Sequence, residues 1–588
     1  MKENRSKLLV LGIALIMVVS VFALFLPGVN NASQNNTKIT SYVQSSFEKS
    51  LSTGTPVQMN SENLSAVQNQ LSKYSATPMS SDQIISFMVS FKITHNSQLT
   101  SYITQEKNPM SPFYHHYLTS SDFQPGALYG PNLTAYNDAI QYYTGMGFTL
   151  TNSYDFGLQF QGNISQVNAA FHTSMMNYII NGVPKFANSR PLEVPSAFSS
   201  SVSSIDGLTN LLNFKPLSMV APAASGSTNS PVPSLTSSAV TQYLSQAQVL
   251  NYSKHSYAYA NIPGYGLTQF LFPTTMPKLY NATGLVSKGY NGKGITIAVV
   301  MCQGYNPSDL QTFSNEVFGN SSQLLNRITN MPVNGALPIS SANYWTSGGA
   351  GEFTLDLEYS STMAPGAHID AVYGPSLSTM SLDTVYMKLT SLTNTPQIVT
   401  NSWGGDEALW FNLYGPSYQN AMTMNSLFKV LNSMGSTVLF SSGDSAGVGA
   451  LTGFLTGSFG ASSPYVVSVG GVRTLATSAT GIMPTGNVSN FTLSPYASNA
   501  QAGGFWFPNF HLNISSASGI ATQSYWYTPS GSTVPFAGGQ VGLSYWFNQS
   551  AYQHGPGIPN SMRQNSVTVS AEADFNETEY FGGMWVFF

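Results

Sequence analysis

The chain carries little charge and almost no cysteine. Of its 588 residues, 7% are Asp, Glu, Lys or Arg, against roughly 25% in ordinary soluble domains. Cys302 is the single cysteine, so no disulfide can form within the chain. Low charge suits strongly acidic surroundings, where carboxylates are protonated and unbalanced cations would repel one another. A cell-surface glycoprotein near neutral pH could share this composition, but we favour acidic surroundings.

Several functional signatures are also missing. The net charge is −4 and no basic run occurs after residue 10, which argues against a nucleic-acid partner. The chain contains no His-Gly-Thr, no His-Glu-x-x-His and no paired Asp-Thr-Gly. These absences argue against the histidine-based chemistry of subtilisins, against zinc peptidases and against pepsin-type peptidases.

The N-terminus predicts export. Lys2, Arg5 and Lys7 precede an apolar run at residues 8–26, which is either a signal peptide or an uncleaved membrane anchor. We expect the rest of the chain to be extracellular or at the cell surface. Asn-x-Ser/Thr tripeptides give weak support for an exported glycoprotein; they include Asn31, Asn63, Asn132, Asn163, Asn251, Asn281, Asn487, Asn513, Asn548 and Asn576.

Composition divides the chain into five segments. We expect a signal or anchor at 1–29, a polar linker at 30–77, a small α+β domain at 78–212, a linker with a processing site at 213–264, and a large domain at 265–588. In the small domain, the spacing of apolar residues predicts helices over 81–104 and 136–146, and strand-like alternation over 148–161.

In the large domain, short apolar runs alternate with helical patterns. Strands are predicted at 295–302, 367–373, 398–402 and 437–442, and helices at 355–363 and 417–434. This alternation is typical of an α/β fold with a doubly wound, mostly parallel sheet. Active sites in such sheets lie at the carboxyl ends of the strands, so polar residues there are candidates.

Two carboxylates form the first candidate site. Glu352 and Asp356 are four residues apart in a helical pattern and therefore lie on one helix face. Neighbouring carboxyl groups push their pKa values apart, so that one holds a proton while the other can accept one. A solvated helix face with incidental acids is the alternative interpretation.

A second candidate follows the strand at 437–442. Asp444 stands in a glycine-rich turn, Ser441-Ser-Gly-Asp-Ser445, where a protonated carboxyl could donate a hydrogen bond to an oxyanion. The sequence Gly443-Asp-Ser445 also resembles a trypsin-like motif with Ser445 as nucleophile, but no histidine stands in a recognisable catalytic context. An ordinary turn remains a third interpretation.

Together these motifs resemble the sedolisin (kumamolisin-like) family of serine-carboxyl peptidases. The segments similar to the family's activation prodomain are Ser111-Pro-Phe-Tyr-His-His-Tyr-Leu-Thr119, Tyr129-Gly-Pro131, Gly147-Phe148, Phe186-Ala-Asn188, Val194-Pro195 and Gly207-Leu208. Those similar to its catalytic domain are Gly292-Lys-Gly294, Glu352 and Asp356 with Ala364-Pro-Gly366, Asn401-Ser-Trp-Gly-Gly405, Gly443-Asp-Ser445, Ser463-Pro-Tyr465, Gly470-Gly471, Gly538-Gly539, Ser544-Tyr-Trp-Phe547, Tyr552-Gln553 and Ser570-Ala-Glu-Ala-Asp574.

The resemblance implies a subtilisin-like catalytic fold and a Ser-Glu-Asp mechanism acting on protein or peptide substrates. It makes Glu352 the base that takes the serine proton, Asp356 the residue that tunes it, and Asp444 the oxyanion donor. It places Trp403, Gly404 and Gly443 in the substrate cleft, and it makes the prodomain an intramolecular inhibitor. Carboxyl groups in place of histidine suit catalysis in acid, where imidazole would stay protonated.

One family feature is missing. The resemblance places the nucleophilic serine in a Gly-Thr-Ser segment soon after Asp574, and residues 1–588 contain no such segment. The family's calcium loop, which would follow, is missing as well, so we expect no cofactor in this chain. We expect a fragment of a longer peptidase precursor that is inactive as it stands. The alternatives are an inactive surface glycoprotein that binds peptides in a vestigial cleft, and a structural cell-envelope protein.

Overall fold

The computed structural model describes most of two adjoining domains. The described residues are 54–59, 64–216, 257–262, 266–271, 273, 276–280, 282–320, 322–339, 348–415, 418–444, 457–476, 512–513, 520–525, 527–528, 537–538, 540, 542–554, 562–575 and 582–584. We call residues 54–216 the N-terminal domain and the described residues from 257 onward the C-terminal domain. The apolar segment at 8–26, most of the expected linker at 213–264 and Ser445 lie outside the described residues.

The N-terminal domain has an α+β fold around a four-stranded antiparallel sheet, in the order β4-β5-β3-β9. Its sheet strands are β3 (Ile84–Phe91), β4 (Thr149–Tyr154), β5 (Gly157–Asn163) and β9 (Val202–Asp206). The other elements are β1 (Pro56–Gln58), α2 (Leu64–Leu71), β2 (Ala76–Pro78), α3 (Asn96–Glu106), η1 (Ser120–Phe123), α4 (Leu133–Gly145), α5 (Ile164–Ala170), β6 (Met175–Ile180), β7 (Val183–Asn188), β8 (Glu193–Pro195), α6 (Ser196–Ser199) and β10 (Lys215–Pro216).

The helix predicted at 136–146 is present as α4. The stretch predicted as a strand over 148–161 forms two strands instead, β4 and β5, which pair as a hairpin. The helix predicted over 81–104 is wrong in its first half, where the chain forms β3. Four consecutive residues of β3, from Phe87 to Ser90, are fully buried. Because the strand is covered on both faces, its apolar run lacks the alternation that identifies a half-exposed strand.

The fold also begins earlier than the predicted boundary at residue 78. β1 pairs with β8, and Val67 and Leu71 of α2 are buried in the core. Val67 and Leu71 are four residues apart and share one helix face, although the surrounding polar residues give the stretch the composition of a linker.

The C-terminal domain is built on a mostly parallel sheet, as predicted. Strands β14, β15, β13, β16, β18 and β20 follow one another in parallel, and β27 pairs in parallel with β20. Their bounds are β13 (Thr296–Cys302), β14 (Ile328–Pro332), β15 (His368–Gly374), β16 (Ile398–Asn401), β18 (Thr437–Ser441), β20 (Val467–Ala476) and β27 (Val569–Phe575). The α/β fold class and the preceding α+β domain are therefore confirmed.

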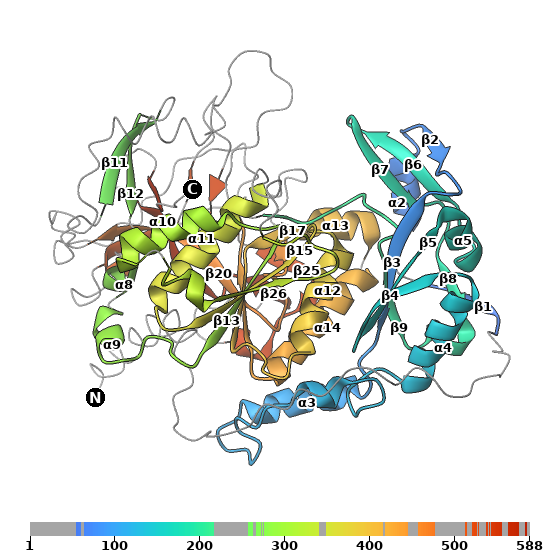
Figure 1. Ribbon diagram of the computed structural model, residues 1–588, viewed down its shortest axis with the longest axis horizontal. Helices are drawn as coiled ribbons and strands as arrows, with labels where there is room; N and C mark the ends of the chain where they lie inside the picture. Colours follow the sequence, from blue (N-terminus) through green and yellow to red (C-terminus); the bar gives the residue numbers. More distant parts are fainter. Residues whose placement is uncertain are drawn as a thin grey trace.

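Helices cover both faces of this sheet. They are α10 (Pro307–Phe318), α11 (Gly348–Met363), α12 (Thr379–Thr390), α13 (Glu407–Tyr414) and α14 (Gln419–Ser433). Smaller elements are β11 (Tyr257–Ile262), β12 (Gly266–Leu271), α8 (Met276–Leu279), α9 (Thr283–Ser287), η3 (Leu325–Arg327), β17 (Trp403–Asp406), β19 (Ser458–Phe459), β21 (Leu512–Asn513), β22 (Ile520–Tyr525), β23 (Tyr527–Thr528), β24 (Ala537–Gly538), β25 (Gly542–Asn548), η5 (Ala551–Gln553), β26 (Arg563–Ser566) and β28 (Gly582–Met584). Figure 1 shows α12 and α14 on the side of the sheet that faces the N-terminal domain.

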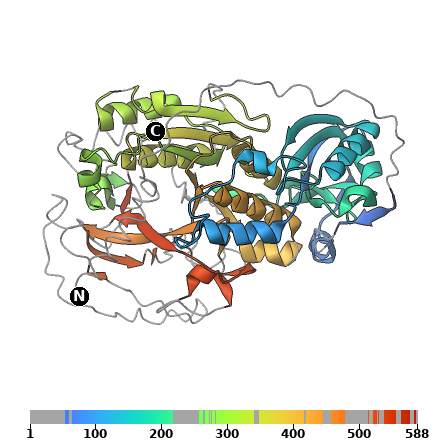
Figure 2. The ribbon, with the colours of Figure 1, turned by 90° about the horizontal axis from the view of Figure 1, so that it is seen from below.

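The two domains pack against each other through α14. Figure 2 shows α3 of the N-terminal domain lying beside it. Lys429 of α14 donates from its ammonium group to the backbone carbonyl of Asn96 (2.9 Å) and to the hydroxyl of Thr100 (2.5 Å). The backbone N–H of Leu118 donates to the carbonyl of Ser433 at the end of the helix (2.9 Å).

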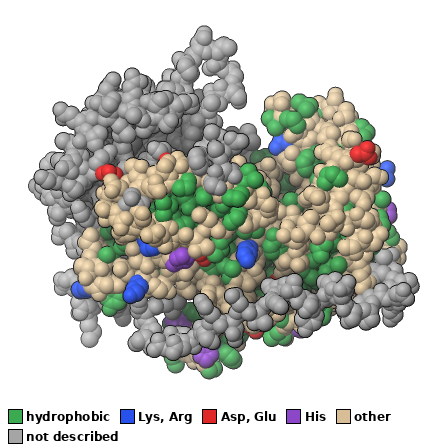
Figure 3. All heavy atoms as spheres, viewed as in Figure 1, with side chains coloured by type: hydrophobic (Ala, Val, Ile, Leu, Met, Phe, Trp, Pro, Cys, Tyr) green, Lys and Arg blue, Asp and Glu red, His purple; other side chains and the backbone are tan. Residues whose placement is uncertain are grey.

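The surface reflects the low charge of the sequence. In Figure 3 the visible side chains are mainly uncharged polar or hydrophobic, with acidic and basic groups widely scattered. In the part of the chain that the structure describes, no helix is both long and apolar enough to cross a membrane.

Candidate active site

The two predicted carboxylates lie on α11. This helix packs on β13, near the middle of the parallel sheet, and Phe353 and Leu357 fill that contact with fully buried side chains. Glu352 is buried, with a relative exposure of 5%, and Asp356 lies one helical turn later. Burial, and then the charge of Glu352, raise the pKa of Asp356 well above its ordinary range. Burial therefore favours the protonated form of Asp356.

A hydrogen bond joins this helix to the carboxyl end of β16. The hydroxyl of Ser402, the residue after the strand, donates to Oδ1 of Asp356 over 2.9 Å. The other oxygen, Oδ2, is buried and has no hydrogen-bond partner among the described residues. The Ser402 bond opposes the rise in the pKa of Asp356, but burial has the larger effect. No pattern in the sequence identifies Ser402 as a partner of Asp356, because the two residues are 46 positions apart.

Asp444 follows the neighbouring strand. β16 and β18 pair in parallel, with Asn401 opposite Phe440, so Ser402 and Asp444 emerge at the same edge of the sheet. Gly443 has a φ of +104°, a conformation that glycine adopts at little cost. Its carbonyl accepts a hydrogen bond of 2.7 Å from the backbone N–H of Gln540. The sheet thus brings the segments of all three predicted carboxyl residues to the end where its chemistry is expected.

Trp403 is an interior residue in this structure. Its indole is fully buried and packs against Phe214 and Phe440, with ring centroids 4.8 and 5.0 Å away. Its N–H donates to the hydroxyl of Tyr386 (3.1 Å), which donates in turn to Asn401 (2.5 Å). The buried indole therefore fixes β17 against the core. Only the backbone of β17 is left to pair with the next strand.

That next strand comes from the N-terminal domain. β10 pairs antiparallel with β17, placing Lys215 opposite Gly404 and Pro216 opposite Trp403. Just before β10, Phe214 stacks on Trp410 with ring centroids 4.4 Å apart and an angle of 8°. The backbone N–H of Phe214 also donates to Leu377 (3.0 Å). The end of the N-terminal domain thus lies along the strand predicted to bind substrate. Phe214 was not anticipated from the sequence, because it falls inside the expected linker.

No metal site is evident in the described ranges. Nowhere in them do three histidine, cysteine or carboxylate side chains come together as ligands of one ion would.

Comparison with known proteins finds similarity to one family of peptidases. Residues 73–211 match the family "Pro-kumamolisin, activation domain". Over 193 residues the chain is 31% identical to kumamolisin of Bacillus sp. (strain MN-32). The aligned stretch covers 32% of this chain and 32% of that protein. The match therefore spans about a third of kumamolisin's length.

Two solved peptidase structures match this chain at lower sequence identity. One is Pseudomonas sedolisin, a serine-carboxyl proteinase complexed with two molecules of pseudo-iodotyrostatin. It superposes with a TM-score of 0.36 at 19% sequence identity, and the match covers 51% of this chain and 70% of the sedolisin chain. A mutant of the epidermin leader peptide processing serine protease from Staphylococcus aureus has a TM-score of 0.32 at 9% identity, covering 67% and 70%. Residues 73–211 are therefore similar to the pro-kumamolisin activation domain, and the chain resembles the sedolisin-family peptidases, as its motifs predict.

Proposed function

We propose that the chain is the precursor of an acid-acting serine-carboxyl endopeptidase. The observation that carries this proposal is the pairing of β10, at the end of the activation domain, with β17, the strand of the Asn401-Ser-Trp-Gly-Gly405 motif. Extended peptides can bind a protein by adding a strand to an open edge of a sheet. An activation domain that occupies this edge would exclude a substrate, which is what a zymogen requires.

The carboxyl residues support the proposed chemistry. Glu352 would accept the proton of an attacking serine, and protonated Asp356 would hold Glu352 in place and control its charge. Asp444, when protonated, would donate a hydrogen bond to the oxyanion that forms on the substrate carbonyl. The serine itself would come from a Gly-Thr-Ser segment, which residues 1–588 do not contain.

We place the enzyme outside the cell in acid. The apolar run at 8–26 after three cations supports export, either with a cleaved signal or with a retained anchor. The low charge of the chain and the burial that raises the pKa of Asp356 both suit low pH. Protein or peptide substrates would enter the cleft after the segment between about Pro216 and Leu271 is cut.

The proposal is tested on the reading frame that follows Phe588. We expect codons for Gly-Thr-Ser close after it, and we expect the extended protein to digest denatured protein after incubation at acid pH. N-terminal sequencing of the product should place the new terminus between Pro216 and Leu271. An immediate stop codon would contradict the enzyme and favour a peptide-binding surface protein. A new terminus before Gly207 would contradict the assigned domain boundary.

A further inference from the structure

Two buried carboxyl groups meet where the domains join. Asp206 ends β9 of the N-terminal domain, and Asp383 lies on α12 of the C-terminal domain. Both are almost fully buried, at 1% and 0% exposure. Asp206 bonds to Thr379 at the start of α12, and Asp383 lies one helical turn further along the same helix. The charge of Asp206 also contributes to raising the pKa of Asp383.

The two groups differ in their surroundings. Asp206 accepts hydrogen bonds from Ser204 of its own domain (2.8 Å) and from Asn420 of α14. Thr379, at the start of α12, also bonds to it. Asp383 has no hydrogen-bond partner for either oxygen among the described residues. A buried carboxylate ion without partners is far more costly than the neutral acid, so the docked state requires a proton on Asp383.

The groups that pack around this pair supply no compensating positive charge. On α12, Tyr386 is the other titratable group that faces Asp383, while the side chain of Lys388 is exposed. On α14, Lys429 is directed to Asn96 and Thr100 of α3 instead. Among the described residues, the ion pairs join His172 to Glu193 and His368 to Asp370, each within one domain.

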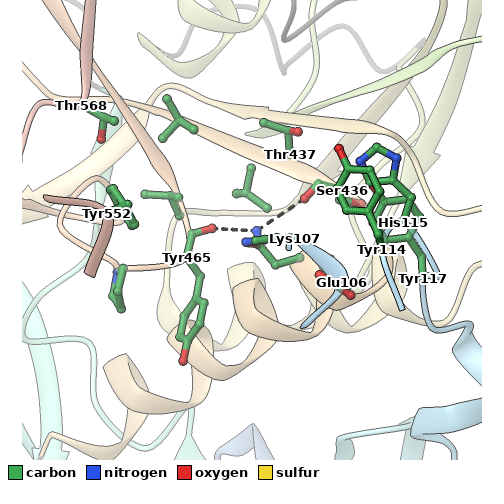
Figure 4. Close-up of a pocket in the computed structure, with 16 residues that line it drawn as sticks. Glu106, Lys107, Tyr114, His115, Tyr117, Ser436, Thr437, Tyr465, Tyr552 and Thr568 are labelled. Carbon is green, nitrogen blue, oxygen red and sulfur yellow. Dashed lines mark hydrogen bonds between the residues drawn. The ribbon is translucent and has the colours of Figure 1, made fainter. Parts of the chain in front are cut away.

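A third buried carboxyl group without hydrogen-bond partners lies at the other side of α14. Glu106, at the end of α3, is fully buried, and neither of its carboxyl oxygens has a partner among the described residues. It borders a cavity of about 430 Å³ between the domains. Figure 4 shows Glu106 and Lys107 on one side of this cavity and Tyr465 and Thr568 on another. Lys107 reaches across to the side-chain oxygen of Asn432 (2.7 Å).

We propose that this interface is an acid-stabilised latch: it holds the N-terminal domain closed at low pH and loosens as Asp206, Asp383 and Glu106 ionise toward neutral pH. Acid alone therefore does not release the N-terminal domain, and in an active precursor release in acid would depend on cutting the chain. The latch rests on the docked arrangement and not on peptidase activity, so it can fail or hold independently of the proposed function.

The direction of the effect follows from the pKa shifts. Burial raises the pKa of Asp206 to about 6, although the hydrogen bonds it accepts oppose the shift. Burial raises the pKa of Glu106 to about 8 against the charge of Lys107, and burial with the charge of Asp206 raises that of Asp383 well above its ordinary range. A group whose pKa is higher in the docked state stabilises docking at low pH and loses that contribution as the pH rises through the docked value.

Hydrogen exchange on the intact 588-residue chain at pH 4 and pH 8 tests the latch, with rates corrected for the intrinsic effect of pH. We expect the opening equilibrium constant at β9 and α14 to be at least about tenfold larger at pH 8 than at pH 4, since one pKa unit corresponds to a factor of ten. Opening at β13 and β15 should change much less. Asp383→Asn and, separately, Asp206→Asn should reduce the pH effect at β9 and α14.

The matched control is Asp309→Asn, which removes a carboxyl on α10 whose pKa burial also raises to about 6. It should keep the wild-type pH effect at β9 and α14. Equal or stronger protection of these elements at pH 8 in the wild type would overturn the latch. So would an undiminished pH effect in Asp383→Asn with β13 and β15 still protected.

Discussion

The hydroxyl of Ser402 donates to Oδ1 of Asp356 across 2.9 Å and so connects the end of β16 to α11. Because β16 is a central strand of the parallel sheet, this bond fixes the carboxyl pair relative to the strand ends. It is the contact by which the sheet positions Asp356.

Ser402→Ala should remove this bond, and the methyl side chain of alanine cannot replace the lost hydroxyl donor. We expect the free energy of unfolding to fall by about 1 kcal/mol, the usual contribution of one such hydrogen bond. Denaturant unfolding at pH 5 measures it, with Ser402→Thr as the variant that keeps a hydroxyl. An unchanged midpoint in Ser402→Ala would show that the bond contributes nothing to stability.

Asp356→Asn should flatten the dependence of stability on pH. Because the pKa of Asp356 is raised in the fold, the wild type gains stability from this group at low pH and loses it as the pH rises. The melting temperature of Asp356→Asn relative to the wild type should therefore increase steadily from pH 4 to pH 8. The exposed Asp82→Asn serves as the control. A constant difference at all pH values would mean that Asp356 is not held protonated.

Phe214→Ala should release β10 from β17. The side chain is buried between Trp403, Trp410 and Phe459, and emptying such a site costs about 3 kcal/mol or more. Hydrogen exchange should accelerate in residues 403–406, whereas Phe113→Ala, which alters a partly exposed ring, should leave them protected. Unchanged protection in Phe214→Ala would show that the aromatic contact does not hold the strand.

The chain of residues 1–588 should show no peptidase turnover. Its sequence has no Gly-Thr-Ser segment to supply the nucleophile, and Ser445 has no histidine base in a recognisable motif. Digestion of denatured protein at acid pH is the assay. Turnover that survives purification and is lost in Ser445→Ala would assign the nucleophile to Ser445 and refute the proposed chemistry.

Local patterns predicted the central part of the parallel sheet because four of its strands, β13, β15, β16 and β18, lie in short apolar runs. The other parallel strands, β14, β20 and β27, have no such run. Local patterns failed at β3, whose unbroken apolar run is compatible with either a helix or a strand. The carboxyl pair on α11 was predictable because four-residue spacing places Glu352 and Asp356 on one face.

Contacts between distant segments were not predictable in this way. Asn420 and Asp206 are 214 residues apart, and no local pattern indicates that β9 docks on α14. The same holds for β10, whose two residues form a strand only because β17 offers an edge to pair with. The contacts that join β9 to α14 and β10 to β17 therefore arise only in the tertiary structure.

The central claim is that Glu352 is the base of a serine-carboxyl peptidase. The direct test measures kcat against pH in the protein extended through its Gly-Thr-Ser segment, for the wild type and for Glu352→Gln and Asp444→Ala. We predict acid turnover in the wild type, none in Glu352→Gln, and a loss of about 10²–10³ in kcat for Asp444→Ala. Wild-type kcat should fall as the pH rises. Near-normal turnover in a folded Glu352→Gln would contradict the account.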